Sequence, residues 1–184
     1  MKTLEDQMSF YAAYHQDGRN KLTHFFGVPA IIFAILIPLS WPGVSLAGWN
    51  ITPALVIAAV VLGYYLVLDL ALGLCMMVVF GALMHAAALV AALPLQVGLA
   101  WFAAFFIGGW IVQLVGHVFE GRKPALADNL FQIFVAPIFL AAEVAFMLGM
   151  RKDLESRVNA RALKMRAEAG FRAPGAPGSV QTGA

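Results

Sequence analysis

Two of the chain's four histidines lie in the stretch "YHQDGRNKLTHFFGVP", where a polar N-terminus meets a long apolar sequence. His15 and His24 are about 2.5 helical turns apart, so in one continuous helix their rings would point in opposite directions. Gly18 is typical of a helix C-terminus and Asn20 of an N-cap, so we expect a break between two helices here. Such a break allows both imidazoles to bind one metal ion. The alternative is that His15 is a solvated residue beside a membrane and that His24 caps a helix.

A second group of polar residues lies in "QLVGHVFEGRKPALADN". Gln113, His117 and Glu120 are spaced i, i+4 and i+7, which puts them on one helical face. They indicate either a polar patch at a helix end or a functional site, with Glu120, Asn20 and Gln113 as candidate catalytic residues. Asn20 would then touch the metal or position its ligands. Three histidine ligands would leave open positions on a metal, as a catalytic site requires, and imidazole suits iron, zinc, copper and nickel. Glu120 is then a fourth ligand, an orienter of His117 or a general base.

The composition indicates a membrane protein. Of the 184 residues, 61% are hydrophobic and only 12% are charged, whereas a soluble domain is about 45–50% apolar and about 25% charged. A single cysteine, Cys75, excludes a disulfide framework within the chain. We find no phosphate-binding loop and no nucleic-acid-binding pattern, so no nucleic-acid partner is expected.

The apolar sequence divides into four predicted membrane spans, at residues 25–39 (completed from 22 onward), 53–70, 71–93 and 95–118. A helix needs about 20 apolar residues to cross the hydrocarbon core. The apolar run over 53–93 is about twice that length, so we expect it to fold back near Asp69 and Gly73. Asp69 would either cap a helix at this turn or hydrogen-bond a ligand histidine.

Charge placement then predicts the topology. Lys2, Arg19 and Lys21 precede the first span, and Arg122 and Lys123 follow the fourth. Basic residues favour the cytoplasmic side, and four spans return the chain to the side on which it started.

By this topology His15, His24 and His117 lie at one membrane edge. His85 is the fifteenth residue of the third span, about 20 Å along that helix. We therefore expect His85 to be a hydrogen-bonded core residue and not a ligand.

A fifth apolar stretch, residues 130–150, contains Pro137 and Glu143 and is followed by basic residues that also favour the inside. It is either a Pro-broken, re-entrant or interfacial pair of half-helices or a true fifth span, and the charge pattern favours the first. The predicted fold is thus an all-α, polytopic transmembrane helix bundle. Residues 1–150 would form the membrane-embedded catalytic domain with an N-terminal cytoplasmic helix, 151–169 a charged cytoplasmic helix and 170–184 a disordered tail.

Many of these residues also belong to a longer pattern: Tyr14-His15, Asn20, His24, Val28-Pro29, Gln113, Gly116-His117, Glu120, Pro124-Ala125-Leu126, Asp128-Asn129-Leu130, Ala136-Pro137 and Glu143. This pattern resembles the 2-hydroxy fatty acid dioxygenases, the family of small membrane proteins named for the metabolism of phytosphingosine to odd-numbered fatty acids. The resemblance extends over residues 10–150, and the block from His117 to Leu130 is its most specific part.

The resemblance implies an iron(II)-dependent enzyme of fatty acid α-oxidation. Such an enzyme cleaves the C1–C2 bond of a 2-hydroxy fatty acid with O2 and releases CO2 and a fatty acid one carbon shorter. The family's motif histidines correspond to His15, His24 and His117. Three neutral imidazoles on Fe²⁺ leave positions for the 2-hydroxy carboxylate and for O2. The substrate carboxylate would be attracted by basic residues, unless these are only topology signals: Arg19, Lys21, Arg122 and Lys123.

Two other functions fit the same residues: a zinc-dependent membrane hydrolase with Glu120 as base, and a non-catalytic membrane scaffold or transporter. In every case the lipid bilayer is a partner. The absence of organelle signals favours a bacterial inner membrane, with both termini and the metal site on the cytoplasmic side.

Overall fold

The computed structural model describes residues 3–121 and 131–168, and nearly all of them are helical. Along the described chain the elements are α1 (Leu4–Tyr14), α2 (Gly18–Leu39), β1 (Val44–Leu46), β2 (Trp49–Ile51), α3 (Pro53–Leu68), α4 (Leu70–Ala91), α5 (Leu95–Glu120), α6 (Gln132–Met147) and α7 (Lys152–Glu168). The predicted all-α fold is confirmed.

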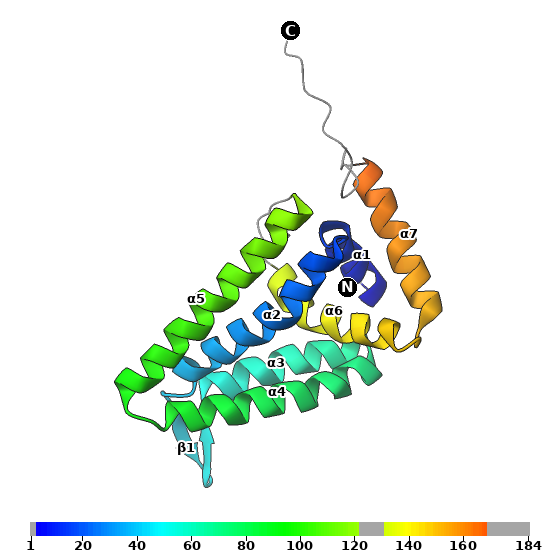
Figure 1. The fold of residues 1–184 in the computed structure, drawn as a ribbon. Helices are drawn as coiled ribbons and strands as arrows, with labels where there is room; N and C mark the ends of the chain where they lie inside the picture. Colours follow the sequence, from blue (N-terminus) through cyan, green and yellow to red (C-terminus); the bar gives the residue numbers. More distant parts are fainter. Residues whose placement is uncertain (1–2, 122–130, 169–184) are drawn as a thin grey trace.

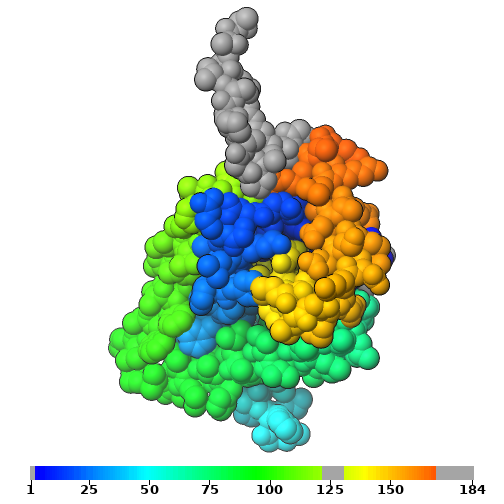
Figure 2. Space-filling view, turned by 45° about the vertical axis from the view of Figure 1, so that its right-hand side comes forward, coloured from blue at the N-terminus to red at the C-terminus, as the bar shows by residue number. Residues whose placement is uncertain are grey.

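The helices form two parts, which meet where α6 packs against α2 and α4 (Figure 1). On one side α2 packs along α5, while α3 and α4 pair with each other and support α2. On the other side α1 packs between α6 and α7, around buried side chains such as Met8, Phe139 and Val158. Figure 2 shows α6 and α7 beside each other on the surface near the N-terminal residues.

Three described helices are long and apolar enough to cross a membrane by length and composition: α2, α4 and α5. The helix α3, which corresponds to the second of the four predicted spans, has 16 residues, or about 24 Å, which is short of a hydrocarbon core of about 30 Å. Large apolar side chains such as Val60, Val78 and Val118 are exposed on α3, α4 and α5. Exposed apolar surface of this extent is typical of a protein that contacts lipid.

The predicted turn at Asp69 is confirmed. Asp69 ends α3 and also caps α4, because its Oδ1 accepts from the Leu72 backbone N–H at 3.0 Å. Its carboxylate forms an ion pair with Arg151 and not with a histidine. A Cβ on Gly73 would lie 2.8 Å from the Leu66 backbone, so a glycine is needed for the two helices to fold back this tightly.

The helix α6 corrects the prediction for the fifth apolar stretch. It runs without interruption through Pro137, the sixth of its 16 residues, so the expected break into half-helices is not present. A proline removes one backbone donor and crowds the carbonyl four residues earlier, which here belongs to Ile133. The missing bond falls close to the first turn, and the helix continues beyond it.

The loop between α2 and α3 holds a short antiparallel hairpin that we did not predict. Val44 pairs with Ile51 and Leu46 with Trp49. The two turn residues, Ala47 and Gly48, both adopt positive φ, as two-residue hairpin turns require. The hairpin projects from the end of the molecule away from α1 (Figures 1 and 2).

The approach of α2 to α5 depends on glycine and yields a first prediction. A Cβ on Gly109 would lie 2.7 Å from the Ile31 side chain and 3.1 Å from the Gly27 carbonyl oxygen, whereas a Cβ on Gly108 would meet nothing within 4 Å. We expect Gly109→Ala to lower the stability of the protein by about 1–3 kcal/mol through overpacking. Thermal unfolding in detergent measures the change.

The neighbouring glycine is the matched control. Gly108→Ala should leave the unfolding temperature unchanged or raise it, because alanine is the better helix former by about 0.5–1 kcal/mol. Equal unfolding temperatures for the two variants would show that the helices do not meet closely at Gly109.

Candidate metal centre

The predicted break between the two N-terminal histidines is present, but its boundaries differ. The helix α1 ends at Tyr14 and α2 begins at Gly18, so Gly18 opens the second helix and does not end the first. The N-cap is Asp17, whose Oδ1 accepts from the Arg19 backbone N–H at 2.8 Å. Aspartate is among the best N-caps, and it takes the role that we expected of Asn20, which lies inside α2.

His15, His24 and His117 come together where α1, α2 and α5 meet. All three are buried, and one ring nitrogen from each lies within 4.8 Å of the others. Their ring centroids are 4.6 Å apart for His15–His24, 5.2 Å for His15–His117 and 5.1 Å for His24–His117. Residues distant in sequence therefore provide a compact cluster of nitrogen donors, and we call it the histidine triad.

Backbone carbonyls orient two of these rings. His15 Nδ1 donates to the Tyr11 carbonyl oxygen and His24 Nδ1 to the Asn20 carbonyl oxygen, each at 2.8 Å. A carbonyl can only accept, so Nδ1 carries the proton in both rings and Nε2 carries the lone pair. Histidine ligands of a metal usually donate their other ring N–H to a carbonyl or carboxylate oxygen in this way.

Two ring nitrogens of the triad have no hydrogen-bond partner among the described residues: His15 Nε2 and His117 Nδ1, both buried. Buried polar atoms without partners are rare in proteins and need an explanation. Burial lowers the pKa of His15 well below its usual range, and the neighbouring His24 lowers it further. His15 is therefore neutral at pH 7, in the form that binds a metal. The triad thus fits a metal ion.

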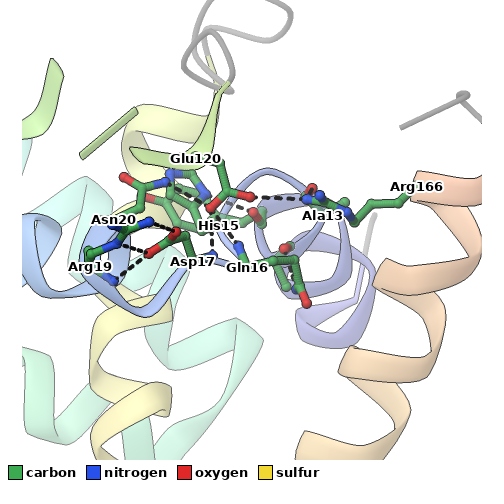
Figure 3. Close-up of polar contacts among 10 residues, drawn as sticks. Ala13, His15, Gln16, Asp17, Arg19, Asn20, Glu120 and Arg166 are labelled. Atoms are coloured by element: carbon green, nitrogen blue, oxygen red, sulfur yellow. Dashed lines mark hydrogen bonds and ion pairs between the residues drawn. The ribbon is translucent and has the colours of Figure 1, made fainter. Parts of the chain in front are cut away.

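Glu120 joins this site to three other segments (Figure 3). Its Oε2 accepts from the backbone N–H groups of Gln16 and Asp17 at 3.0 and 2.7 Å and from Asn20 Nδ2 at 3.4 Å. Its Oε1 accepts from Arg166 Nη1 at 3.1 Å. Both oxygens therefore face donors of the protein, which favours a positioning role over the alternatives of ligand or base.

Arg166 reaches this carboxylate from α7. Its Nη1 also donates to the Ala13 carbonyl oxygen at 2.8 Å, and the side chains of Arg166 and Glu120 are 5% and 0% exposed. Arg166 therefore bridges the end of α5, through the ion pair, and the last turn of α1, through the Ala13 carbonyl next to His15. We call Glu120 and Arg166 the buried clamp.

The triad faces a small cavity of about 60 Å³. One water needs about 10–15 Å³ by this measure, so a few small groups fit, but a long acyl chain does not. Most of the wall is apolar, with three polar side chains besides the triad: Tyr11, Gln113 and Gln132. Gln113, a sequence-predicted residue, also packs against Gly27 of α2.

The basic residues predicted near the substrate carboxylate have other partners where the structure describes them. Arg19 pairs with Asp17 at 2.8 Å, and Lys21 pairs with Glu143 at 2.9 Å. Arg122 and Lys123 lie outside the described residues, as does the predicted tail at 170–184.

His85 corrects another expectation. It lies on an exposed face of α4 and not in the core, and it is not a member of the cluster formed by the triad. His85 does lie within the third predicted span, now α4, but an apolar helix gives no sequence signal for which of its faces is covered.

Several residues of the site were not identified from the sequence. Tyr11, whose ring stacks on His15 with centroids 4.0 Å apart, is four residues before that histidine, and this spacing was a usable signal. Gln132 was visible as a polar residue at the start of an apolar stretch. Arg166 gave no signal, because 46 residues separate it from Glu120.

Comparison with known proteins gives two related findings. A family model described as "2-hydroxy-palmitic acid dioxygenase Mpo1-like" matches residues 1–148. The chain is also 35% identical over 157 residues to the 2-hydroxy-palmitic acid dioxygenase MPO1 of Saccharomyces cerevisiae, over 83% of this chain and 86% of that protein. No solved structure matches.

The buried clamp yields a second prediction. In Glu120→Gln an amide replaces one acceptor oxygen, and the Arg166 guanidinium loses its counter-charge while remaining buried. Breaking a buried ion pair in this way lowers the free energy of unfolding by about 3–5 kcal/mol. The segment between α1 and α2 also loses the charged acceptor of its backbone N–H groups. We expect a lower unfolding temperature and less bound metal, measured by thermal unfolding and elemental analysis.

An exposed ion pair provides the contrast. Lys164 Nζ and Glu168 Oε1 are 3.9 Å apart, and both side chains are exposed. Lys164→Gln should therefore lower the free energy of unfolding by less than about 1 kcal/mol. If Glu120→Gln were no more destabilising than Lys164→Gln, the clamp would not hold the site together.

Proposed function

The chain belongs to the Mpo1-like family of 2-hydroxy-palmitic acid dioxygenases, and we propose that it is an iron(II)-dependent dioxygenase of 2-hydroxy fatty acids. The observation that carries this proposal is the buried histidine triad at the wall of a small cavity. Three neutral imidazoles suit iron(II) and leave coordination positions for substrate and O2. The family and the donor set therefore lead to the same chemistry.

The proposed reaction shortens the fatty acid by one carbon. The C1–C2 bond breaks, C1 leaves as CO2, and C2 is oxidised to the new carboxylate. The electrons released by both carbons reduce O2, and one water forms for each O2 consumed. No other oxidant or reductant is needed.

The residues of this chain would hold and shield the reacting groups. His15, His24 and His117 would bind the iron, which when bound supplies the redox chemistry that lets O2 react with the substrate. The carbonyls of Tyr11 and Asn20 keep two of these rings in the tautomer whose Nε2 binds metal. The buried clamp holds the α1–α2 break against α5, so the ring positions are set before substrate arrives.

The apolar wall of the cavity supports substrate entry from the bilayer. Val28, Ile31 and Ile32 of α2 and Trp110 of α5 line it, and both helices are long and apolar enough to cross a membrane. The head group would occupy the cavity while the acyl chain extends between helices toward lipid. We further propose that the site lies on the cytoplasmic side, as the basic residues around α2 favour.

A zinc hydrolase with Glu120 as general base is not supported by the same geometry. A general base must face the water that it activates. Both Glu120 oxygens instead accept hydrogen bonds from Gln16, Asp17, Asn20 and Arg166. We therefore keep the dioxygenase as the proposed function.

The third prediction tests this function directly. Purified protein with Fe(II) and O2 should convert 2-hydroxypalmitate to pentadecanoate with stoichiometric O2 uptake. Mutation of the groups that hydrogen-bond to metal ligands lowers metal affinity or activity by about 10–100-fold. Removing a ligand by His15→Ala, His24→Ala or His117→Ala should therefore lower activity by more than about 100-fold and reduce the bound iron. Product analysis, an oxygen electrode and elemental analysis measure these changes.

His85→Ala is the matched control, since His85 is an exposed histidine on α4 away from the triad. It should retain wild-type iron and activity. An inactive wild type with iron and O2 present would contradict the proposal. Bound zinc with no O2 uptake would favour a hydrolase, and full activity in all three triad variants would exclude the triad as the active centre.

A further inference from the structure

Gln132, the first residue of α6, is a buried polar side chain to which neither the family comparison nor the proposed function gives a role. It is 2% exposed and lines the cavity that the histidine triad faces. Its Oε1 and Nε2 are both buried, and neither has a hydrogen-bond partner among the described residues. The amide thus has its whole hydrogen-bonding capacity unused beside the proposed active centre.

An unsatisfied buried amide is costly. Leaving a buried donor or acceptor without a partner costs on the scale of a lost hydrogen bond or more, and most buried side-chain polar atoms have a partner. Gln7, a buried glutamine of α1, donates from Nε2 to the Tyr64 hydroxyl at 3.1 Å, so only its Oε1 lacks a partner among the described residues, whereas Gln132 lacks a partner at both atoms. A ligand in the cavity that bonds both atoms of Gln132 would remove the cost.

The position of Gln132 on its helix indicates the charge of that ligand. It stands at the N-terminus of the 16-residue α6, which has no side-chain cap. Ile133 and Ala136 from the same helix end also line the cavity. The positive end of the helix dipole favours an anion there, and the basic residues Arg19 and Lys21 already have acidic partners.

We propose that Gln132 binds the head group of a 2-hydroxy carboxylate, with Nε2 donating to a carboxylate oxygen and Oε1 accepting from the 2-hydroxyl. The inference rests on the proposed function and names a residue that selects its substrate. A carboxamide carries one donor group and one acceptor on the same carbon, and the 2-hydroxy carboxylate presents the complementary acceptor and donor. No other described side chain of the cavity wall has both of its polar atoms buried and without a partner.

Selection of 2-hydroxy acids by the site depends on Oε1 of Gln132, the acceptor atom. A fatty acid without the 2-hydroxyl provides no donor to Oε1, which stays buried and unpaired. Sites that hydrogen-bond a substrate hydroxyl reject analogues that lack it, because the polar group of the site remains unsatisfied. Gln132 would therefore favour 2-hydroxy acids over fatty acids that lack the hydroxyl.

The fourth prediction compares binding in the full-length, iron-loaded protein under anaerobic conditions, where no turnover occurs. Gln132→Met keeps the approximate shape of the side chain and removes both polar atoms. We expect it to raise the Kd for 2-hydroxypalmitate about tenfold or more, since one hydrogen bond to a charged group accounts for about tenfold. The Kd for palmitate should change less, because palmitate loses only the bond to its carboxylate and no longer leaves Oε1 buried and unpaired. Gln132→Glu, which places a negative charge near the substrate carboxylate, should weaken binding of both acids.

Two further measurements separate a binding role from a structural one. If Gln132 serves the ligand, Gln132→Met should unfold at the same or a higher temperature than wild type and bind the same amount of iron, because it removes two unsatisfied buried atoms. The control Gln7→Met removes a glutamine outside the cavity and should leave both Kd values unchanged.

The outcomes are distinguishable from those of the activity test. An active wild type whose Gln132→Met variant keeps its Kd values and its preference for the 2-hydroxy acid would overturn this inference alone. Loss of iron or of folding in Gln132→Met would assign the residue a structural role and would also overturn it. An inactive wild type would instead contradict the proposed function.

Discussion

The arrangement of the site depends on one buried carboxylate. Glu120 lies at the end of α5, three residues after His117, and accepts hydrogen bonds from the α1–α2 break and from Arg166 of α7. A charge at 0% exposure is tolerated only when it is paired and its oxygens are satisfied. The same bonds that satisfy Glu120 fix His15 relative to His117, so the cost of burying the charge is offset by contacts that position the triad.

The buried clamp also gives α7 a structural role that its amino-acid composition does not indicate. The family model matches residues 1–148, and α7 begins at Lys152. The charged sequence of α7, after the apolar spans, would place this helix at the periphery of the protein. Its ion pairs with Glu5 and Asp6 of α1 are indeed partly exposed. Arg166 is different, because it is buried and contacts the carboxylate that orders the site. The helix after the apolar region therefore supports the centre itself.

Different interactions organise the two sides of α2: close helix packing on one side and buried polar groups on the other. Along α5, glycines let the helices approach until a Cβ would clash, as at Gly109. Interfaces of this kind are typical of membrane helices, where small residues allow close contact. Near α1 and α6, several buried polar side chains line the cavity, and among these His15 Nε2, His117 Nδ1 and both polar atoms of Gln132 have no partner among the described residues, so a metal or a substrate would find them available.

The sequence by itself determined the helical, membrane-type fold, the turn at Asp69, the existence of a break between His15 and His24, and the family. These features are local or compositional, since they follow from apolar content, helix spacing and capping preferences. From the sequence we misplaced the cap of α2, expected a break at Pro137 and put His85 in the core. The choice between competing caps, and the face of an apolar helix that is covered, depend on neighbouring elements. Only the tertiary structure decided that Glu120 pairs with Arg166, that Gln132 faces the triad and that one nitrogen from each histidine lies within 4.8 Å of the others. Such contacts join segments far apart in the chain, and no local pattern specifies which of them will meet.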